Sequence, residues 1–163
     1  MILKITRFPN PILRKKSKAI KKITPEIVRL IDNMIATMQQ APGVGLAAPQ
    51  VARSIRVIVA DVGPGPIALV NPKIVKKSGS QVFKEGCLCL PGVEAPVERA
   101  AQVVVRGLDR AGQTVEIQAE ALLATVLQHE IDHLDGILFI DRVKDPSLII
   151  HVPPASEKKE ELI

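Results

Sequence analysis

The segment His-Glu-Ile-Asp-His at residues 129–133 contains the side chains that a metal-dependent hydrolase needs. Residues i and i+4 of an α-helix lie on one face about one turn apart, so His129 and His133 can bind the same ion. Glu130 stands next to the first ligand, where a carboxylate can exchange a proton with a water molecule on that ion. The alternative is a polar helix face that has this sequence by chance. A metal site is favoured because two of the three histidines have ligand spacing and the preceding residues 122–127 are too apolar for a solvated face.

A catalytic metal site usually has three protein ligands and one open position. The third histidine, His151, lies near the C-terminal end and is expected at the surface. A thiolate with two imidazoles suits Zn(II), Fe(II), Co(II) or Ni(II), which makes Cys87 and Cys89 the better candidates. If residues 87–89 are extended, both thiols point to the same side. Cys87 alone would complete a catalytic site, whereas both thiols together would close a structural four-ligand site in which Glu130 has no catalytic task.

Composition limits the class of protein. A chain of 163 residues is long enough for one domain with a core, which aliphatic side chains must fill because there is no Trp or Tyr and only three Phe. No run of 18 apolar residues is present, and nothing at the N-terminus resembles a secretory signal, so we expect no membrane association. The two cysteines stand too close for an unstrained disulfide, which indicates a reducing compartment or a metal-bound thiolate.

Charge is unevenly distributed along the chain. Residues 1–22 contain eight Lys or Arg and no acid, whereas residues 23–163 contain 14 basic and 17 acidic residues. A basic segment of this kind can bind nucleic acid or a ribosome surface. More commonly it is a solvated edge of the fold. A transit peptide is disfavoured because Pro9 and Pro11 would interrupt its helix.

Hydrophobic spacing and turn residues predict two helices. Thr24 followed by Pro25 is typical of a helix start, and apolar residues recur at helical spacing from there to about residue 40. The glycine-rich segment 43–50 is expected to be a loop. The second helix is expected over 121–135, with Gly136 as its C-terminal stop.

Several short strands are expected between and after these helices, with a short final element over 137–143. The expected strands are Ile55–Ala60, Ile67–Asn71, Lys73–Lys76, Ala101–Leu108 and Thr114–Ala119, the last two joined by a hairpin. Residues 85–92 are expected as a loop or strand edge. The prediction is a single α+β domain of short, mostly antiparallel sheets packed around a central helix that carries the histidines.

Three segments, in this order and spacing, resemble the bacterial peptide deformylases: Gly43–Gln50 (GVGLAAPQ), Glu85–Leu88 (EGCL) and His129–His133 (HEIDH). The resemblance extends over nearly the whole chain to about residue 144. It implies a catalytic domain over 1–144 and a partly disordered C-terminal tail over 145–163.

The resemblance also implies an activity. Cys87, His129 and His133 would bind one divalent metal ion, Fe2+ natively and often replaced by Zn2+ or Ni2+. Glu130 would accept a proton from water and return it to the leaving amine. The reaction would remove the formyl group from N-formyl-methionyl nascent peptides in the cytoplasm and release formate.

Further roles follow from the same resemblance. The side-chain amide of Gln50 and the backbone N–H of Leu88 would stabilise the developing oxyanion. Gly45 would offer backbone groups to the substrate. The residues expected to line the methionine pocket are Val44, Leu122 and Val126, although core packing would explain each nearly as well.

One residue departs from the family pattern, since Cys89 stands where the family usually has Ser. This second thiol raises the risk of metal misligation or oxidation. We also expect Glu85 and Arg99 to pair in support of the loop. Two competing functions are a zinc endopeptidase and a non-catalytic module that contacts the ribosome transiently through the basic arm and holds a structural zinc ion.

Overall fold

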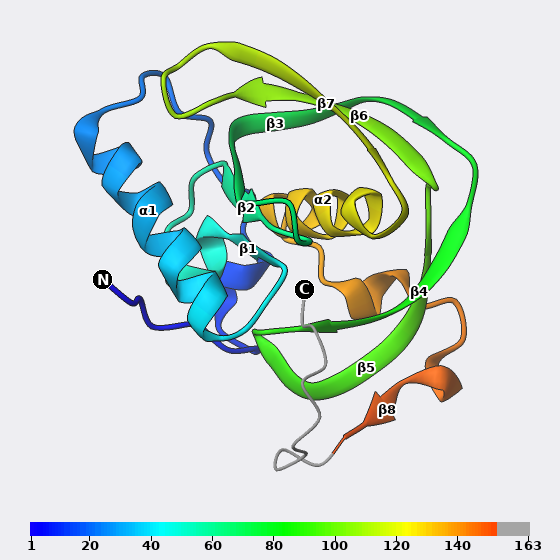
Figure 1. The fold of residues 1–163 in the computed structure, drawn as a ribbon. Helices are drawn as coiled ribbons and strands as arrows, with labels where there is room; N and C mark the ends of the chain where they lie inside the picture. Colours follow the sequence, from blue (N-terminus) through cyan, green and yellow to red (C-terminus); the bar gives the residue numbers. More distant parts are fainter. Residues whose placement is uncertain (153–163) are drawn as a thin grey trace.

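The central element of the fold is α2 (Ala121–Leu134). The computed structural model describes residues 1–152. Figure 1 shows α2 between the strands β3, β6 and β7 on one side and β4 and β5 on the other. Every residue from Ala124 to Leu134 is buried. Because no side chain caps its N-terminus, α2 depends on packing for its stability.

The C-terminal end of α2 requires glycine. Gly136 has a φ of 73°, and a Cβ at this position would lie 2.4 Å from the carbonyl oxygen of Arg14. Both the left-handed conformation and the close approach exclude a larger residue. The predicted helix stop is confirmed.

The other helix, α1 (Pro25–Gln40), packs its apolar face against β1 and β2. Thr24 Oγ1 accepts a hydrogen bond from Ile27 N–H at 3.4 Å, as the sequence predicts for its N-terminus. Leu30, Met34 and Met38 are buried at helical spacing. Neither α1 nor α2 is long and apolar enough to cross a membrane.

The strands of residues 1–152 form two antiparallel groups. The larger sheet has the order β1 (Gly45–Ala47), β2 (Val57–Ala60), β3 (Ile67–Ser78), β6 (Gln102–Leu108), β7 (Thr114–Glu120). The smaller group has the order β4 (Gln81–Cys87), β5 (Leu90–Arg99), β8 (Ile150–His151). Short 3-10 helices lie in the segments between or before these elements: η1 (Pro11–Arg14), η2 (Ala48–Val51), η3 (Phe139–Arg142) and η4 (Pro146–Leu148). The predicted α+β class with a central helix is confirmed.

Three expectations about individual strands were wrong. The expected loop over 43–50 contains β1 and most of η2, and the two strands expected over 67–76 are one strand, β3, with register shifts that replace the expected break. The strands β4 and β5 were not predicted. Pro91 and Pro96 argue against a strand in the sequence, but β5 pairs with β8 only at Val93 and Glu94, so neither proline lies between two partner strands and its missing N–H is tolerated.

The tail expected over 145–163 begins with η4 and β8, and β8 pairs with β5. Residues 153–163 of this tail lie outside the described residues. The domain division at residue 144 stays a prediction.

Candidate metal centre

The buried face of α2 brings three polar side chains to one place. His129, Glu130 and His133 are at most 1% exposed. The two imidazole rings have centroids 5.0 Å apart. The helix therefore presents both histidines together, as the i, i+4 spacing predicts.

The two thiols come from the hairpin turn between β4 and β5. Cys87 ends β4 and pairs with Leu90, while Leu88 and Cys89 form the turn itself. Cys87 Sγ lies 3.2 Å from His133 Nε2 and 3.1 Å from Cys89 Sγ. Residues 87–89 are thus not extended, yet both thiols converge on the helix.

A buried ion-pair network connects the hairpin to α2. Arg99 donates from Nε and Nη2 to the two oxygens of Glu85 at 2.6 and 2.9 Å, which confirms the expected pair. It also donates from Nη1 to Asp132 at 2.9 Å. His129 Nδ1 lies 2.8 Å from Glu85 Oε1. Burial alone would raise the pKa of Glu85, but the hydrogen bonds from His129 and Arg99 outweigh it and hold this pKa below its ordinary value.

The network fixes the tautomer of His129. An ionised carboxylate only accepts hydrogen bonds, so Nδ1 of His129 carries the proton and donates it to Glu85. The lone pair is then on Nε2, which is buried and has no hydrogen-bond partner within residues 1–152. A carboxylate behind a metal-binding imidazole commonly orients it in this way.

Several other buried polar atoms at the same place lack a hydrogen-bond partner in the part of the chain that the structure describes. They are both carboxyl oxygens of Glu130 and Nδ1 of His133. Leaving such groups unpaired costs free energy unless a ligand satisfies them. Two groups of donors in residues 1–152 lie within 4.8 Å of one another, and they share one histidine: Cys87, Cys89 and His133, and His129, Glu130 and His133. The expected ligands Cys87, His129 and His133 span both groups. Soft and borderline donors in this number fit a divalent metal ion.

Electrostatics at the site favour a cation. Burial raises the pKa of Glu130 well above its ordinary value, and the charges of Cys89 and Glu85 act in the same direction. Burial also raises the pKa of the Cys87 thiol and lowers the pKa of His133. A divalent cation would restore the ionised forms of the thiol and the carboxyl.

Gly45 lets the sheet approach Glu130. A Cβ on Gly45 would lie 2.3 Å from Glu130 Oε2 and 2.9 Å from Val126 Cγ1. Any side chain here would displace the carboxylate or the helix. This observation explains the glycine without reference to a substrate.

Gln50 reaches the site from η2 and is fully buried. Its Oε1 accepts a hydrogen bond from Ala47 N–H at 2.9 Å, and its Nε2 donates to Cys87 Sγ at 3.4 Å. The amide group is therefore oriented with its N–H donors toward the thiol. Leu88, in the turn, is only 8% exposed and packs in the cluster that contains α1.

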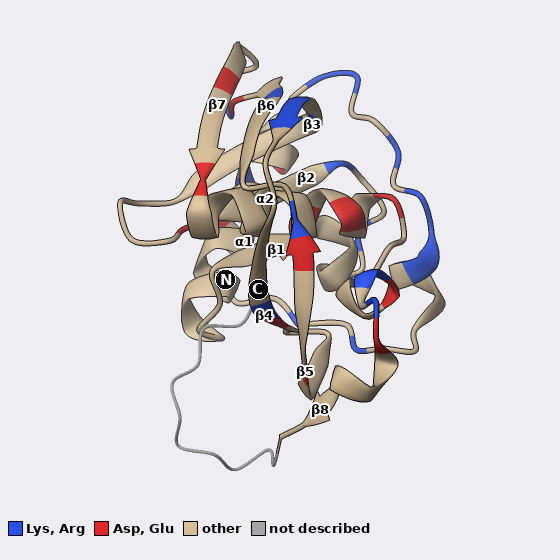
Figure 2. Cartoon of the chain, turned by 90° about the vertical axis from the view of Figure 1, so that its right-hand side faces the viewer, with Lys and Arg blue, Asp and Glu red and all other residues tan. Residues whose placement is uncertain are grey.

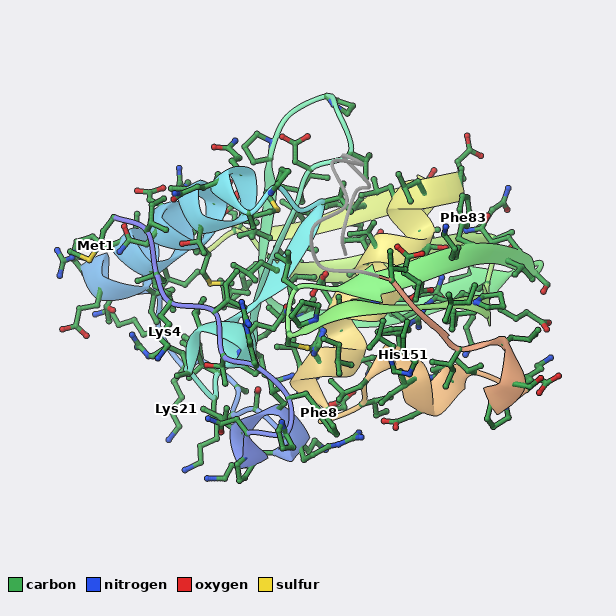
Figure 3. The ribbon with its side chains drawn as sticks, turned by 90° about the horizontal axis from the view of Figure 1, so that it is seen from below. Met1, Lys4, Phe8, Lys21, Phe83 and His151 are labelled. Atoms are coloured by element: carbon green, nitrogen blue, oxygen red, sulfur yellow. The ribbon has the colours of Figure 1, made fainter. Side chains whose placement is uncertain are left out.

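The expected methionine-pocket residues lie in one apolar cluster. Val44 and Val126 are buried in this cluster, and Leu122 is half-buried against it. Contact of these three residues with a substrate stays a prediction. His151 is exposed on β8, as expected (Figure 3).

Sequence reasoning missed two members of the network. Asp132 binds Arg99 and also accepts from Arg142 Nη2 at 2.8 Å. Its signal in the sequence is a second acid between the two histidines of α2, beside Glu130. Arg142 has no comparable signal, because η3 brings it to α2 only in the folded chain.

The chain matches the family model described as polypeptide deformylase over residues 2–148. It is 58% identical over 134 residues to the peptide deformylase of Alkaliphilus metalliredigens (strain QYMF), covering 82% of this chain and 91% of that one. It is 51% identical over 146 residues to the peptide deformylase of Desulfitobacterium hafniense (strain DSM 10664 / DCB-2), covering 90% and 97%. The crystal structure of peptide deformylase from Thermotoga maritima superposes with a TM-score of 0.87 at 41% identity, covering 89% of this chain and 99% of that chain.

Proposed function

This chain belongs to the polypeptide deformylase family, and we propose that it is a metal-dependent hydrolase that removes the formyl group from N-formyl-methionyl nascent peptides and releases formate. The observation that carries the proposal is the buried carboxyl group of Glu130, which has no hydrogen-bond partner among the described residues, beside the donors of His129 and His133. The family match does not favour a zinc endopeptidase or a non-catalytic zinc module.

In this proposal Cys87, His129 and His133 hold one divalent ion. Peptide deformylases are metal-dependent, and we propose Fe2+ as the native ion, with Zn2+ or Ni2+ as replacements. An ion held there supplies Lewis-acid polarisation of the formyl oxygen and lowers the pKa of a nearby water molecule. Metal analysis of anaerobically purified protein, combined with formate release, identifies the ion.

Side-chain and backbone groups of the chain transfer the proton and stabilise the oxyanion. Glu130 accepts the proton of the attacking water and passes it to the amine that leaves. The amide of Gln50 and the backbone N–H of Leu88 donate to the oxygen that becomes negative as the formyl carbon turns tetrahedral. The hydrogen bond from Ala47 N–H to Gln50 Oε1 supports this role, because it directs the N–H donors of Gln50 toward Cys87.

The substrate binds along β1, which is an edge strand of the larger sheet. An extended peptide can pair with the backbone of such an edge, and Gly45 contributes backbone groups to it. The side chains of Val44, Leu122 and Val126 contact the methionine side chain of the substrate.

Product analysis tests the activity. The purified protein is given a formyl-methionyl peptide and the same peptide without the formyl group. We expect formate from the first peptide and no internal cleavage of either. Cleavage of a backbone peptide bond with no formate would instead establish an endopeptidase.

The proposal includes a transient contact with the ribosome in the cytoplasm, through residues 1–22. Figure 3 shows this arm running from Met1 through Lys4 to Phe8, and Figure 2 shows Lys and Arg positions along one edge of the molecule. Lys15, Lys16, Lys21 and Lys22 are exposed. Clustered lysines of this kind attract RNA phosphates.

Co-sedimentation with ribosomes at increasing salt tests the contact. Charge reversal at Lys21 and Lys22 should weaken binding more than the matched reversal at Lys76 and Lys77, which are exposed on β3. If both double variants weaken ribosome binding equally, the binding depends only on net charge, which would contradict a specific contact through residues 1–22.

A further inference from the structure

The side chain of Cys89 occupies a position at the centre that the proposed mechanism does not use. It is fully buried, and its Sγ lies 3.1 Å from Cys87 Sγ. The turn that carries it is held in place, because the carbonyl oxygen of Cys89 accepts a hydrogen bond from Phe8 N–H at 2.9 Å. The second thiol is therefore part of the site's fixed geometry.

We infer that Cys89 is a fourth ligand, so that Cys87, Cys89, His129 and His133 together bind a thiophilic ion such as Zn(II) and close the centre against water. The Sγ atoms of Cys87 and Cys89 and one ring nitrogen of His133 lie within 4.8 Å of one another, and His133 also belongs to the donor group that contains His129. This inference rests on the proposed metal centre and assigns Cys89 a role in selecting the ion.

The donor types decide which ion takes each set. Two thiolates with two imidazoles are a softer set than one thiolate with two imidazoles, and they prefer zinc-like ions over harder ions such as Fe(II). Cys89 would bind as a thiolate, with its proton released to solvent and no change of oxidation state. As a fourth protein ligand it would leave no position open for water.

The consequence concerns Glu130, whose carboxyl oxygens are buried and have no hydrogen-bond partner in residues 1–152. Glu130 needs a water molecule to act on. When Cys89 fills the open position, this carboxylate has no proton to accept. With a harder ion the centre thus keeps a position for water and can hydrolyse its substrate. With a thiophilic ion four protein ligands fill the centre and it cannot.

A simpler role for Cys89 is apolar packing, since it lies in one cluster with Leu13 and Phe139. Cys89→Ala separates the two roles, because alanine retains a small apolar side chain but cannot bind a metal. Cys89→Ser serves as a second variant if the alanine variant does not fold.

Cobalt substitution provides a readout that does not depend on activity. Thiolate-to-Co(II) charge-transfer absorption scales with the number of bound thiolates, so the parent should absorb about twice as strongly per cobalt as Cys89→Ala. Turnover per bound zinc should also be higher in Cys89→Ala than in the parent, because the variant keeps the open position.

Equal absorption per cobalt in the parent and both Cys89 variants would overturn the inference. The Cys87→Ala variant distinguishes this failure from failure of the proposed centre. If Cys87→Ala retains its cobalt and the full absorption, then Cys87 is not a ligand and both the centre and the inference are wrong.

Discussion

The two elements that meet at the metal centre are held in place by different means. The proposed ligands His129 and His133 lie on one rigid helix whose buried residues pack against the larger sheet, so their spacing is set by the helix alone. The β4–β5 turn that carries the thiols depends on an ion-pair network between residues that are far apart in the sequence, in which Arg99 joins Glu85 to Asp132. Damage to α2 should therefore lower stability before it affects the site, and damage to the hairpin network should affect the site before it lowers stability.

The largest effect is expected where the hairpin supplies a ligand. Cys87→Ser replaces a soft thiolate by a weak, mostly protonated hydroxyl, so both metal content and formate release should collapse. Metal analysis after dialysis and a formate assay measure the two losses. Full metal content in this variant would remove Cys87 from the ligand set.

The next effect concerns Gln50, which contacts the hairpin thiol. Gln50→Leu removes one donor to the oxyanion at similar size, and turnover should fall by roughly 10²–10³ while KM and metal content change little. Gln50→Glu should be at least as damaging because a carboxylate repels the oxyanion. Steady-state kinetics at saturating metal test this. Turnover within about threefold of the parent, under about 0.7 kcal/mol, would leave Gln50 with a structural role only.

Weakening the ion-pair network of Arg99 should have a moderate effect on metal affinity. Arg99→Lys cannot form the bidentate pair with Glu85, so the orientation of His129 should loosen and metal affinity should fall by about 10–100-fold. Arg106→Lys is the matched control, because it changes an exposed Arg–Glu pair with Glu116 on β6 and β7. Competition with a chelator measures both variants. Equal affinities would mean that the buried network does not support the ligands.

The smallest effect on the site is expected from α2. Ala124→Gly removes a buried methyl group and adds backbone freedom, which should lower the free energy of unfolding by about 1–2 kcal/mol. Metal affinity of the folded protein should stay within about threefold of the parent, because the i, i+4 spacing persists. The matched change on α1, Ala36→Gly, calibrates the loss of helix propensity. A large loss of metal affinity in Ala124→Gly would contradict the expected difference between α2 and the β4–β5 hairpin.

The same contrast explains what the sequence could predict. The pair of histidines on α2 was predictable because helical spacing is local. The β4–β5 hairpin was not, since Pro91, Pro96 and charged residues break its strand pattern and its pairing depends on the folded sheet. The contact between Asp132 and Arg99 and the closeness of Cys89 to Cys87 are likewise products of tertiary structure.

In the proposed mechanism Glu130 is a proton acceptor beside a metal ion and not one of its essential ligands. Glu130→Gln keeps the shape of the side chain and removes its basicity. We measure metal content and turnover on a formyl-methionyl peptide in the same preparation. We expect at least about a hundredfold loss of turnover with metal content nearly unchanged. Retained turnover, or loss of the metal together with activity, would contradict it.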